Sequence, residues 1–313
     1  MEKKLKSLSV VIPCYNEQDV LEHSIKELIP LLEKWEGKII SDYQIVFTNN
    51  GSLDNTLNEM LKIKEKFKKV KILDLRNNYG YQCSITAGLY NADHELIVSI
   101  DSDLQDDPKK IEEMINLHYK GYDLVLGIRD NRKSDSYFKR IFSEFFYIFM
   151  SFLGTQTIRN HGDFRLMTKE LVEDLKHYPE QNRFLRGLIL KLDNKWASVY
   201  YPRRKRKYGT TKFKPVNLVS LALDGITSFS IKPIRFILIL GVIMFLISIC
   251  LIMYILFITI INGDAVKGWA STLLIILFFG GIQNIILGVM GEYVAKTYIE
   301  TKNRPLFRIR KIY

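Results

Sequence analysis

The stretch "ELIVSIDSDLQDDP" (residues 95–108) decides the fold, because an apolar, strand-like run ends there in a cluster of carboxylates. The run before the cluster is short, apolar and partly β-branched, as in a buried strand. Asp101, Asp103, Asp106 and Asp107 follow it. Crowded carboxylates repel one another, and each costs desolvation energy unless a cation lies between them. The stretch therefore predicts a cation-binding loop at the end of a strand.

Strand-like runs of this kind alternate with amphipathic runs over the first part of the chain. We expect strands at 8–13, 43–48, 70–75, 95–101 and 123–128, and helices at 17–34, 54–67, 84–92 and 108–119. Such alternation is typical of βαβ units in an α/β fold, with a mainly parallel sheet and helices on both faces. Ligands of such sheets bind beyond the carboxyl ends of the strands. The side chains at those ends include Tyr15, Asn16, Glu17, Asn49, Asn50 and Asp101.

The composition limits the class of protein. The chain has 313 residues and a formal net charge of +11. Its three cysteines show no paired spacing, so we expect neither a disulfide framework nor a zinc site. The apolar run in "MEKKLKSLSVVIP" is too short for a signal peptide and has no small-residue cleavage site, so we expect the N-terminal part to stay in the cytoplasm. The positive charge suits nucleic acid, anionic lipid or phosphate-bearing substrates.

Two uncharged runs, 236–261 and 269–291, are each longer than the roughly 20 residues that a helix needs to span a membrane. A buried core helix is the alternative for either run. Basic residues flank the pair, so we expect a hairpin with both outer ends in the cytoplasm. The segment 137–154 is rich in aromatic residues and is either an interfacial helix or a core helix. The amphipathic segment 215–233 leads into the first run and favours the interface.

These segments divide the chain into four parts. Much of the positive charge then lies beside the membrane, and no nucleic-acid motif is present, so we expect no nucleic-acid partner. The expected parts are a cytoplasmic α/β domain over 1–214, a juxtamembrane helix over 215–233, two transmembrane helices within 234–295 and a basic cytoplasmic tail over 296–313.

The carboxylate cluster indicates a divalent cation. Alternate residues of a strand share one face, so we expect Asp101, Asp103 and Gln105 to point the same way. Three oxygen-bearing side chains suit Mg²⁺ or Mn²⁺. Few protein ligands are needed if a substrate brings phosphate oxygens, and the cation then neutralises a leaving diphosphate. We interpret Asp106 and Asp107 as capping residues of the helix that follows.

An ordered set of motifs resembles the inverting glycosyltransferases of family 2: "VVIPCYNE", "NNGSLDNT" and "DSDLQDDP". Farther along, "GDFRLM" (162–167), "NRFLRG" (182–187), "GTTKF" (209–213) and "GEYVAKTYIETKNRP" (291–305) resemble the polyprenyl-phosphate glycosyltransferases. These include the bactoprenol glucosyltransferases and relatives of dolichol-phosphate mannose synthase. The resemblance covers nearly the whole chain. It implies a GT-A catalytic domain, a nucleotide-sugar donor and a polyprenyl-phosphate acceptor, and bacterial relatives can assemble as homotetramers.

The resemblance also implies roles for single residues. Asp163 in "GDFRLM" matches a catalytic base or acceptor-orienting group, and a structural carboxylate paired with Arg165 is the alternative. The implied contacts to the nucleotide-sugar are Pro13, Tyr15, Glu17 and Asp101, and the implied cation ligands are Asp101, Asp103 and Gln105.

The expected chemistry needs positive charge more than it needs a base. The second pKa of a phosphate monoester is about 6, so the acceptor is already mostly a nucleophilic anion at neutral pH. Catalysis then depends on positioning and on cationic groups that hold two phosphorylated reactants together. Each candidate has a solvated charge or a lipid contact as its alternative. The candidates are Arg129, Arg132, Arg183, Arg206 and Lys212.

Two positions depart from the family pattern. Asn50 replaces an acid that commonly binds the base; its amide can accept from uracil N3–H and donate to a uracil oxygen. Guanine offers two adjacent donors, which suit a carboxylate better, so we favour UDP-sugars over GDP-mannose. Tyr81 stands where close relatives often have a lysine, which removes a potential phosphate contact.

The sequence therefore predicts an enzyme that transfers a sugar with inversion. The expected donor is UDP-glucose or a UDP-N-acetylhexosamine, and the expected acceptor is undecaprenyl phosphate at the cytoplasmic face of the bacterial inner membrane. A separate flippase and a downstream transferase would then use the lipid-linked sugar. The alternatives are a degenerate nucleotide- or lipid-binding homologue and a GDP-mannose-using enzyme. A processive synthase is disfavoured, because two spans cannot readily enclose a polymer.

Overall fold

The structure is a computed structural model. It describes residues 4–130, 160–181, 183–193, 195–202 and 269–313, together with residues 158 and 204 and single residues between 234 and 261. The expected interfacial segments 137–154 and 215–233 lie outside the described residues, and so do Arg132, Arg206 and Lys212.

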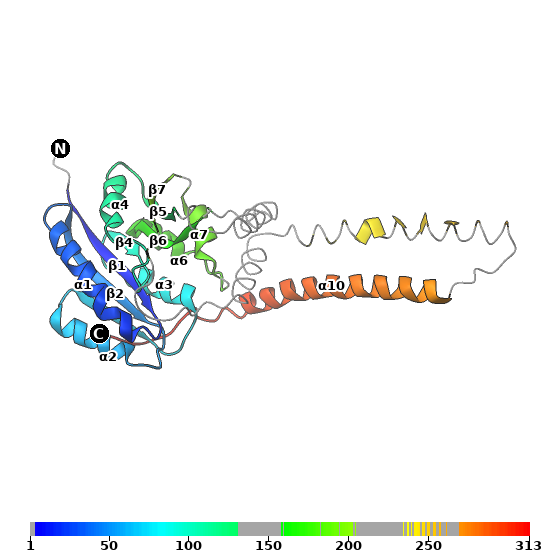
Figure 1. Cartoon of the computed structure of the whole chain (residues 1–313), viewed down its shortest axis with the longest axis horizontal. Coiled ribbons are helices and arrows are strands. Elements are labelled where there is room, and N and C mark those ends of the chain that lie inside the picture. Colours follow the sequence, from blue (N-terminus) through cyan, green and yellow to red (C-terminus); the bar gives the residue numbers. More distant parts are fainter. Residues whose placement is uncertain are drawn as a thin grey trace.

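One mixed sheet forms the centre of the N-terminal domain (Figure 1). Its strands are β1 Lys6–Cys14, β2 Ile40–Asn49, β3 Val70–Leu75, β4 Leu96–Ser99, β5 Leu124–Arg129, β6 His161–Thr168, β7 Trp196–Tyr201 and β8 Ile309–Ile312. Their order is β7-β5-β6-β4-β1-β2-β3-β8. The run from β4 to β3 is parallel, whereas β6 is antiparallel to β4 and β5, and β8 is antiparallel to β3. The sequence analysis predicts β1 to β5 and does not predict β6, β7 and β8.

Helices cover both faces of the sheet, as the sequence predicts. They are α1 Gln18–Trp35, α2 Thr56–Lys66, α3 Tyr81–Tyr90, α4 Lys110–His118, α6 Lys169–Lys176 and α7 Leu185–Leu192. The side chains of α1, α2 and α4 join the apolar cluster on one face, and those of α3, α6 and α7 join the cluster on the other. Val10 of β1 belongs to the first cluster and Val11 to the second, as the pleat of a strand requires.

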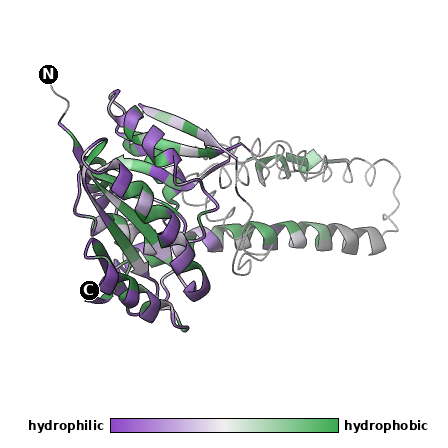
Figure 2. Ribbon diagram, turned by 60° about the vertical axis from the view of Figure 1, so that its left-hand side comes forward, coloured by the Kyte–Doolittle hydropathy of each residue, from purple (hydrophilic) through white to green (hydrophobic). Residues whose placement is uncertain are grey.

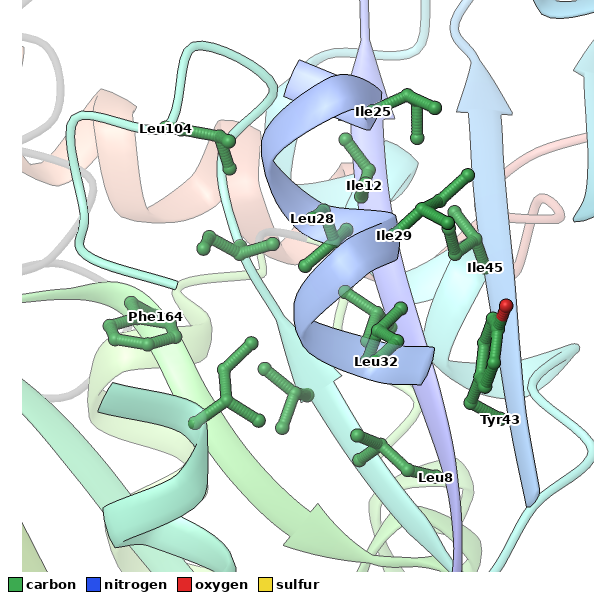
Figure 3. Packing of buried hydrophobic residues seen from close by; sticks show 14 of the residues in the cluster. Leu8, Ile12, Ile25, Leu28, Ile29, Leu32, Tyr43, Ile45, Leu104 and Phe164 are labelled. Atoms are coloured by element: carbon green, nitrogen blue, oxygen red, sulfur yellow. The ribbon is translucent and has the colours of Figure 1, made fainter. Parts of the chain in front are cut away.

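The packing of α1 shows how the apolar pattern fixes the site-bearing edge of the sheet. Ile25, Leu28 and Leu32 recur three or four residues apart and form one apolar stripe. Figure 3 shows this stripe lying over Ile12 of β1 and Ile45 of β2, and all five side chains are buried. Each buried side chain of this size contributes roughly 1.5–3 kcal/mol. The stripe therefore holds α1 against β1 and β2, and it fixes the loop that connects β1 to α1.

Strand β4 ends earlier than the sequence predicts. It stops at Ser99, and residues 102–103 form a turn. Leu104 has a left-handed backbone with φ of 45°. The expectation that strand alternation places Asp101, Asp103 and Gln105 on one face is therefore wrong, because the pleat ends before the first of them.

Helix α10, Trp269–Thr301, begins where the second apolar run begins and continues past residue 291. With 33 residues it is about 50 Å long, more than a bilayer core of about 30 Å requires. Its segment Phe278–Thr301 is the one stretch within the described residues that is long and apolar enough to cross a membrane. Figure 2 shows apolar residues along this helix and polar ones at the end next to the domain. The described residues between 234 and 261 are all helical.

The chain returns to the sheet after α10. Ile72 of β3 and Tyr313 exchange backbone hydrogen bonds of 3.1 and 2.9 Å. Arg310 donates to the carbonyl oxygen of Arg76 at 3.0 Å and lies 3.6 Å from the carboxylate of Asp74. The segment 296–313, expected only as a basic tail, therefore contains the end of α10 and, at Ile309–Ile312, the edge strand β8.

Candidate active site

The carboxyl ends of the parallel strands lie along one edge of the sheet. Because β6 is antiparallel to β4 and β5, its first residues lie at the same edge: His161 is in register with Ile128, and Arg165 with Ser99. Crevices at such edges are the usual ligand sites of α/β sheets. The described site residues gathered at this edge are Pro13, Tyr15, Glu17, Asn50, Asp101, Asp103, Gln105, Arg129 and Asp163.

Asp101 lies between a phenol and a guanidinium. The hydroxyl of Tyr81 donates to Oδ1 of Asp101, and Nη2 of Arg129 lies 3.7 Å from Oδ2. Burial and the charge of Asp106 raise the pKa of Asp101 to about 7, while the Tyr81 hydrogen bond acts in the opposite direction. The side chain is still 31% exposed, so a ligand can reach it. A carboxyl with a perturbed pKa at a strand end is typical of a functional site.

The loop beyond Asp101 is anchored on both sides. The hydroxyl of Ser24 in α1 donates to the carbonyl oxygen of Ser102. The carboxylate of Asp103 accepts from the backbone N–H of Gln105 at 3.2 Å. The first bond attaches the acidic loop to α1, and the second stabilises its turn from within.

Asp106 is an internal partner rather than the helix cap that the sequence suggests. Its side chain is fully buried, and its oxygens accept from Nε and Nη2 of Arg129 at 2.8 and 3.0 Å. The hydroxyl of Tyr201 also donates to it, at 2.8 Å. Although burial works against the charged form, Asp106 raises the pKa of Arg129, so this guanidinium stays charged. Arg129 is thereby fixed between Asp106 and Asp101.

Asp107 bonds to the turn ahead of α4 and is not the capping residue expected from the sequence, because the N-cap position of α4 is Lys109. Its carboxylate accepts from the backbone N–H of Lys109 at 3.1 Å, ahead of α4. Arg204 donates to the same oxygen at 2.5 Å and also pairs with Glu27 of α1. The backbone N–H of Arg204 donates to the carbonyl oxygen of Gln105 at 2.9 Å. The chain that leads into the basic segment after residue 204 is therefore attached to the acidic loop.

The buried carboxylate of Asp163 forms ion pairs with two guanidinium groups. Its Oδ1 accepts from Arg165, and its Oδ2 accepts from Nη2 and Nε of Arg186 at 2.8 and 3.2 Å. Burial alone would raise the pKa of Asp163, but the charges of Arg186 and Arg165 hold it well below its usual range. A carboxylate whose pKa is held this low is a weak base and takes up a proton poorly at neutral pH. This geometry favours an orienting role, and the expected role as base stays a prediction.

His161 lies on the same face of β6 as Asp163. It is 5% exposed, and neither ring nitrogen has a hydrogen-bond partner among the residues that the structure describes. Burial and the charge of Arg165 lower the pKa of His161 well below its usual value, so the ring is neutral. The positive charge of the site therefore comes from its arginines and not from this histidine.

The loops after β1 and β2 hold each other on the side expected to bind the nucleoside. Asn16, with a left-handed φ of 52°, donates through its N–H to Ser52 at 3.0 Å, and its side chain accepts from the N–H of Leu53 at 2.8 Å. The N–H of Glu17 donates to the hydroxyl of Thr56 at 2.8 Å. This loop pair places Tyr15 and Glu17 at the rim of the sheet.

Asn50 is buried and holds the loop before α3. Its side-chain amide donates to the side chain of Asn78 at 3.0 Å and to the carbonyl oxygen of Gly80 at 3.2 Å, and its oxygen accepts from the N–H of Tyr79 at 3.0 Å. Both donor hydrogens are therefore used within the protein. A hydrogen bond from this amide to a uracil oxygen would have to replace one of these two bonds, and the expected contact of Asn50 with the base stays a prediction.

Gly51 explains part of the neighbouring motif. Its φ is 65°, and a Cβ there would lie 2.5 Å from the backbone carbon of Asn77. Only glycine permits this close approach of the two loops.

Arg183 lies apart from the Asp163 pair. Its Nη2 donates to the carbonyl oxygen of Tyr178 at 2.5 Å, and its guanidinium carbon is 5.4 Å from the centroid of the Tyr90 ring. Its Nε and Nη1 are buried and have no hydrogen-bond partner within the described part of the chain. Among the described contacts, the neighbouring Arg186, and not Arg183, pairs with Asp163.

Three residues of this site are not predicted from the sequence as site residues. Tyr81 is noted there only as a departure from the family, Asp106 only as a cap, and Arg186 not at all. A weak signal for Arg186 exists, because it lies in the quoted motif "NRFLRG". No signal links Tyr81 to Asp101, because the two come from different βα units.

The oxygen donors of the acidic loop suit a hard divalent cation. Within the part of the chain that the structure describes, no group of three or more His, Cys, Asp or Glu side chains could share a metal ion. Asp101 and Asp103 alone would leave most of the coordination sphere to substrate oxygens and water, as is usual for Mg²⁺ beside phosphates.

The chain belongs to the family described as Glycosyl transferase family 2, which matches residues 9–176, and it is a glycosyltransferase. Its sheet and flanking helices form a GT-A-like fold, as expected. A solved structure described as "Crystal Structure of a Mycobacterial Protein" is similar in fold, with a TM-score of 0.50, 15% identity, and coverage of 71% of this chain and 73% of that chain.

Two curated relatives match over nearly their whole length. The "Prophage bactoprenol glucosyl transferase homolog" of Escherichia coli (strain K12) is 37% identical over 97% of this chain and 99% of its own. The "Uncharacterized glycosyltransferase YkoT" of Bacillus subtilis (strain 168) is 38% identical over 99% of this chain and 93% of its own.

Proposed function

We propose that this glycosyltransferase transfers a sugar, with inversion, from a UDP-sugar to a polyprenyl phosphate at the cytoplasmic face of the bacterial inner membrane. The observation that carries the proposal is the position of Asp101, between Tyr81 and Arg129, in a domain attached to the long apolar helix α10. Relatives named bactoprenol glucosyl transferase support the acceptor. UDP-glucose and UDP-N-acetylhexosamine are the proposed donors.

On the donor side, Pro13, Tyr15 and Glu17 would bind the nucleoside. Asp101 and Asp103, with Gln105, would hold Mg²⁺ or Mn²⁺ through oxygen atoms. When bound, the cation supplies Lewis-acid neutralisation of the departing diphosphate. Arg129 is fixed by Asp106 at 2.8 Å and needs no rearrangement to face that charge. Preorganised charge of this kind is the main source of transition-state stabilisation in such reactions.

On the acceptor side, the phosphate needs orientation rather than deprotonation, since it is already mostly an anion at neutral pH. Asp163 would act by holding Arg186, because two guanidinium groups keep its carboxylate charged. Arg186 then offers its outer face to a phosphate oxygen, and its side chain is 32% exposed. The further proposed phosphate contacts are Arg129, Arg132, Arg183, Arg206 and Lys212.

The membrane arrangement is part of the proposal. We place the cytoplasmic catalytic domain at 1–214, completed by β8, the juxtamembrane helix at 215–233, two spans within 234–295 and a cytoplasmic segment at 296–313 that leads back to the sheet. The exposed apolar side chains of the helical residues near 236–261, among them Leu246 and Phe257, support a first span beside α10. A homotetramer, a flippase and a downstream transferase complete the expected context.

The proposal is tested by incubating membranes that contain the protein with undecaprenyl phosphate, Mn²⁺ and a panel of UDP-sugars and GDP-mannose. We expect one UDP-sugar to give a lipid product with the mass of the phosphate plus one sugar. Asp103→Ala should reduce transfer by roughly a hundredfold or more while the protein stays folded, since a Lewis-acid cation contributes several kcal/mol. Nucleotide binding without any lipid product would indicate a degenerate homologue, and product from GDP-mannose would refute the proposed donor.

A further inference from the structure

The loop between α6 and α7 joins the membrane helix to the centre of the site. On the inner side, the N–H of Leu185 donates to the side chain of Gln82, next to Tyr81, at 3.3 Å. One residue farther along, Arg186 pairs with Asp163 at 2.8 Å. The loop therefore leads directly into the first residues of α7, which carry these two contacts.

On the outer side, the same loop is bonded to the end of α10. The backbone N–H of Gln181 lies 2.9 Å from each carboxylate oxygen of Glu300, in the last turn of the helix. The side-chain amide of Gln181 donates to the carbonyl oxygen of Arg304 at 2.5 Å. In Figure 1, α10 meets the domain at this end and the following residues cross it to β8. Two independent bonds thus attach one loop residue to the helix and to the segment after it.

We infer that Glu300 is a positioning residue through which the membrane helix α10 sets the geometry of the acceptor-side loop and of Arg186. The inference rests on the proposed function and adds a role for α10 beyond anchoring. Glu300 lies in the last turn of one continuous helix of 33 residues. Tilting of this helix in the bilayer would displace Glu300 and, through the hydrogen bond, the backbone of Gln181. A displacement of about 1 Å at a reacting group can cost a hundredfold in rate.

The inference also explains why a charged side chain lies here. A hydrogen bond from a backbone N–H to a carboxylate is about twice as strong as one between neutral groups. It fixes one peptide unit in direction as well as position, which apolar packing alone does not do. The adjoining contact between the rings of Phe307 and Tyr90, with centroids 6.4 Å apart, packs the same segment without directing it.

The test compares Glu300→Ala, Glu300→Gln and a control in the full-length protein in lipid nanodiscs. The control is Glu292→Ala, which removes the same charge from α10 at an exposed position, where the carboxylate lies 3.8 Å from Nζ of Lys296 on the same helix. In Glu300→Ala we expect faster hydrogen exchange in peptides covering the loop and a roughly ten- to hundredfold loss in kcat/KM for polyprenyl phosphate. Binding of UDP with Mn²⁺ should be unchanged. Glu300→Gln keeps an acceptor oxygen and should retain most of both properties.

The two readouts separate this inference from the proposed function. Hydrogen exchange needs no turnover, so unchanged exchange of the loop in Glu300→Ala overturns the inference even if the wild type transfers sugar. If the loop exchanges faster in Glu300→Ala but the wild type makes no lipid product, the contact is supported and the proposed function is refuted. Equal loss in Glu292→Ala, or loss of UDP binding in Glu300→Ala, would mean general destabilisation and would also overturn the inference.

Discussion

Replacing Tyr81 by phenylalanine removes the hydroxyl that donates to Asp101 and leaves the ring in place. Asp101 then keeps Arg129 at 3.7 Å as its cationic neighbour, while Asp106 continues to oppose its ionisation. The carboxylate must be ionised to bind a divalent cation. The substitution therefore favours the protonated form, and the protonated form competes with the cation.

The size of the effect follows from the strength of the lost bond. A hydrogen bond to a charged group contributes about 1.5–3 kcal/mol, and one pKa unit corresponds to about 1.4 kcal/mol. Because the side chain is 31% exposed, we take the lower end of this range, about one unit. In the wild type, where the pKa is raised to about 7, Mn²⁺ binding in the presence of UDP should strengthen as the pH rises through that value. In Tyr81→Phe the midpoint should move to about 8.

The assay is calorimetric titration of Mn²⁺ into the protein with saturating UDP between pH 6 and 9. Tyr79→Phe is the matched control, since Tyr79 contacts Asn50 through its backbone N–H and not through its hydroxyl. We expect the control to behave as the wild type does. A midpoint in Tyr81→Phe that stays in place or moves to lower pH would refute the reasoning.

Three further outcomes follow from the same contacts. Asp163→Asn leaves the buried Arg165 and the partly exposed Arg186 beside a neutral amide, so the free energy of unfolding should fall by about 3 kcal/mol, measured by chemical denaturation; unchanged stability would contradict this. Arg129→Lys loses the two-pronged contact to Asp106 and should raise the acceptor KM about tenfold or more with the protein still folded; an unchanged KM would exclude the role. Without a cation, the raised pKa of Asp101 means that the folded state binds the proton of this carboxyl more tightly than the unfolded state does. Thermal stability should therefore fall as the pH rises from about 4 to about 7, and added Mn²⁺ should restore it above that range. A rise in thermal stability between these pH values would contradict the prediction.

Much of the fold can be predicted from the sequence because its core follows simple periodicity. The strands β1 to β5 are short apolar runs, and α1 has one apolar stripe, so local pattern and tertiary packing agree. Strand β6 escapes prediction because "HGDFRLMT" mixes buried charged and apolar residues: Asp163 and Arg165 are buried as a pair and hide the alternation. Strand β8 escapes because its side chains are mostly exposed, and its pairing with β3 spans most of the chain length.

The candidate site is predictable in its parts and not in its connections. Asp101 and Arg129 stand out because they follow strands. Their bonds to Tyr81 and Asp106 depend on how separate loops meet, which no local spacing encodes. Asn50 is a residue whose side chain is chemically suited to bind a nucleotide base. Its amide instead donates to Asn78 and Gly80, which its position in the sequence does not predict.

The central claim is that a cation and a nucleotide bind at the end of β4, above Asp101. It is tested most directly by an anomalous difference map from crystals grown with UDP and Mn²⁺. We expect one manganese peak within coordination distance of Asp101 or Asp103, with the diphosphate on the side of the metal that faces away from these carboxylates. A peak elsewhere, with this loop free of both metal and nucleotide, would contradict it.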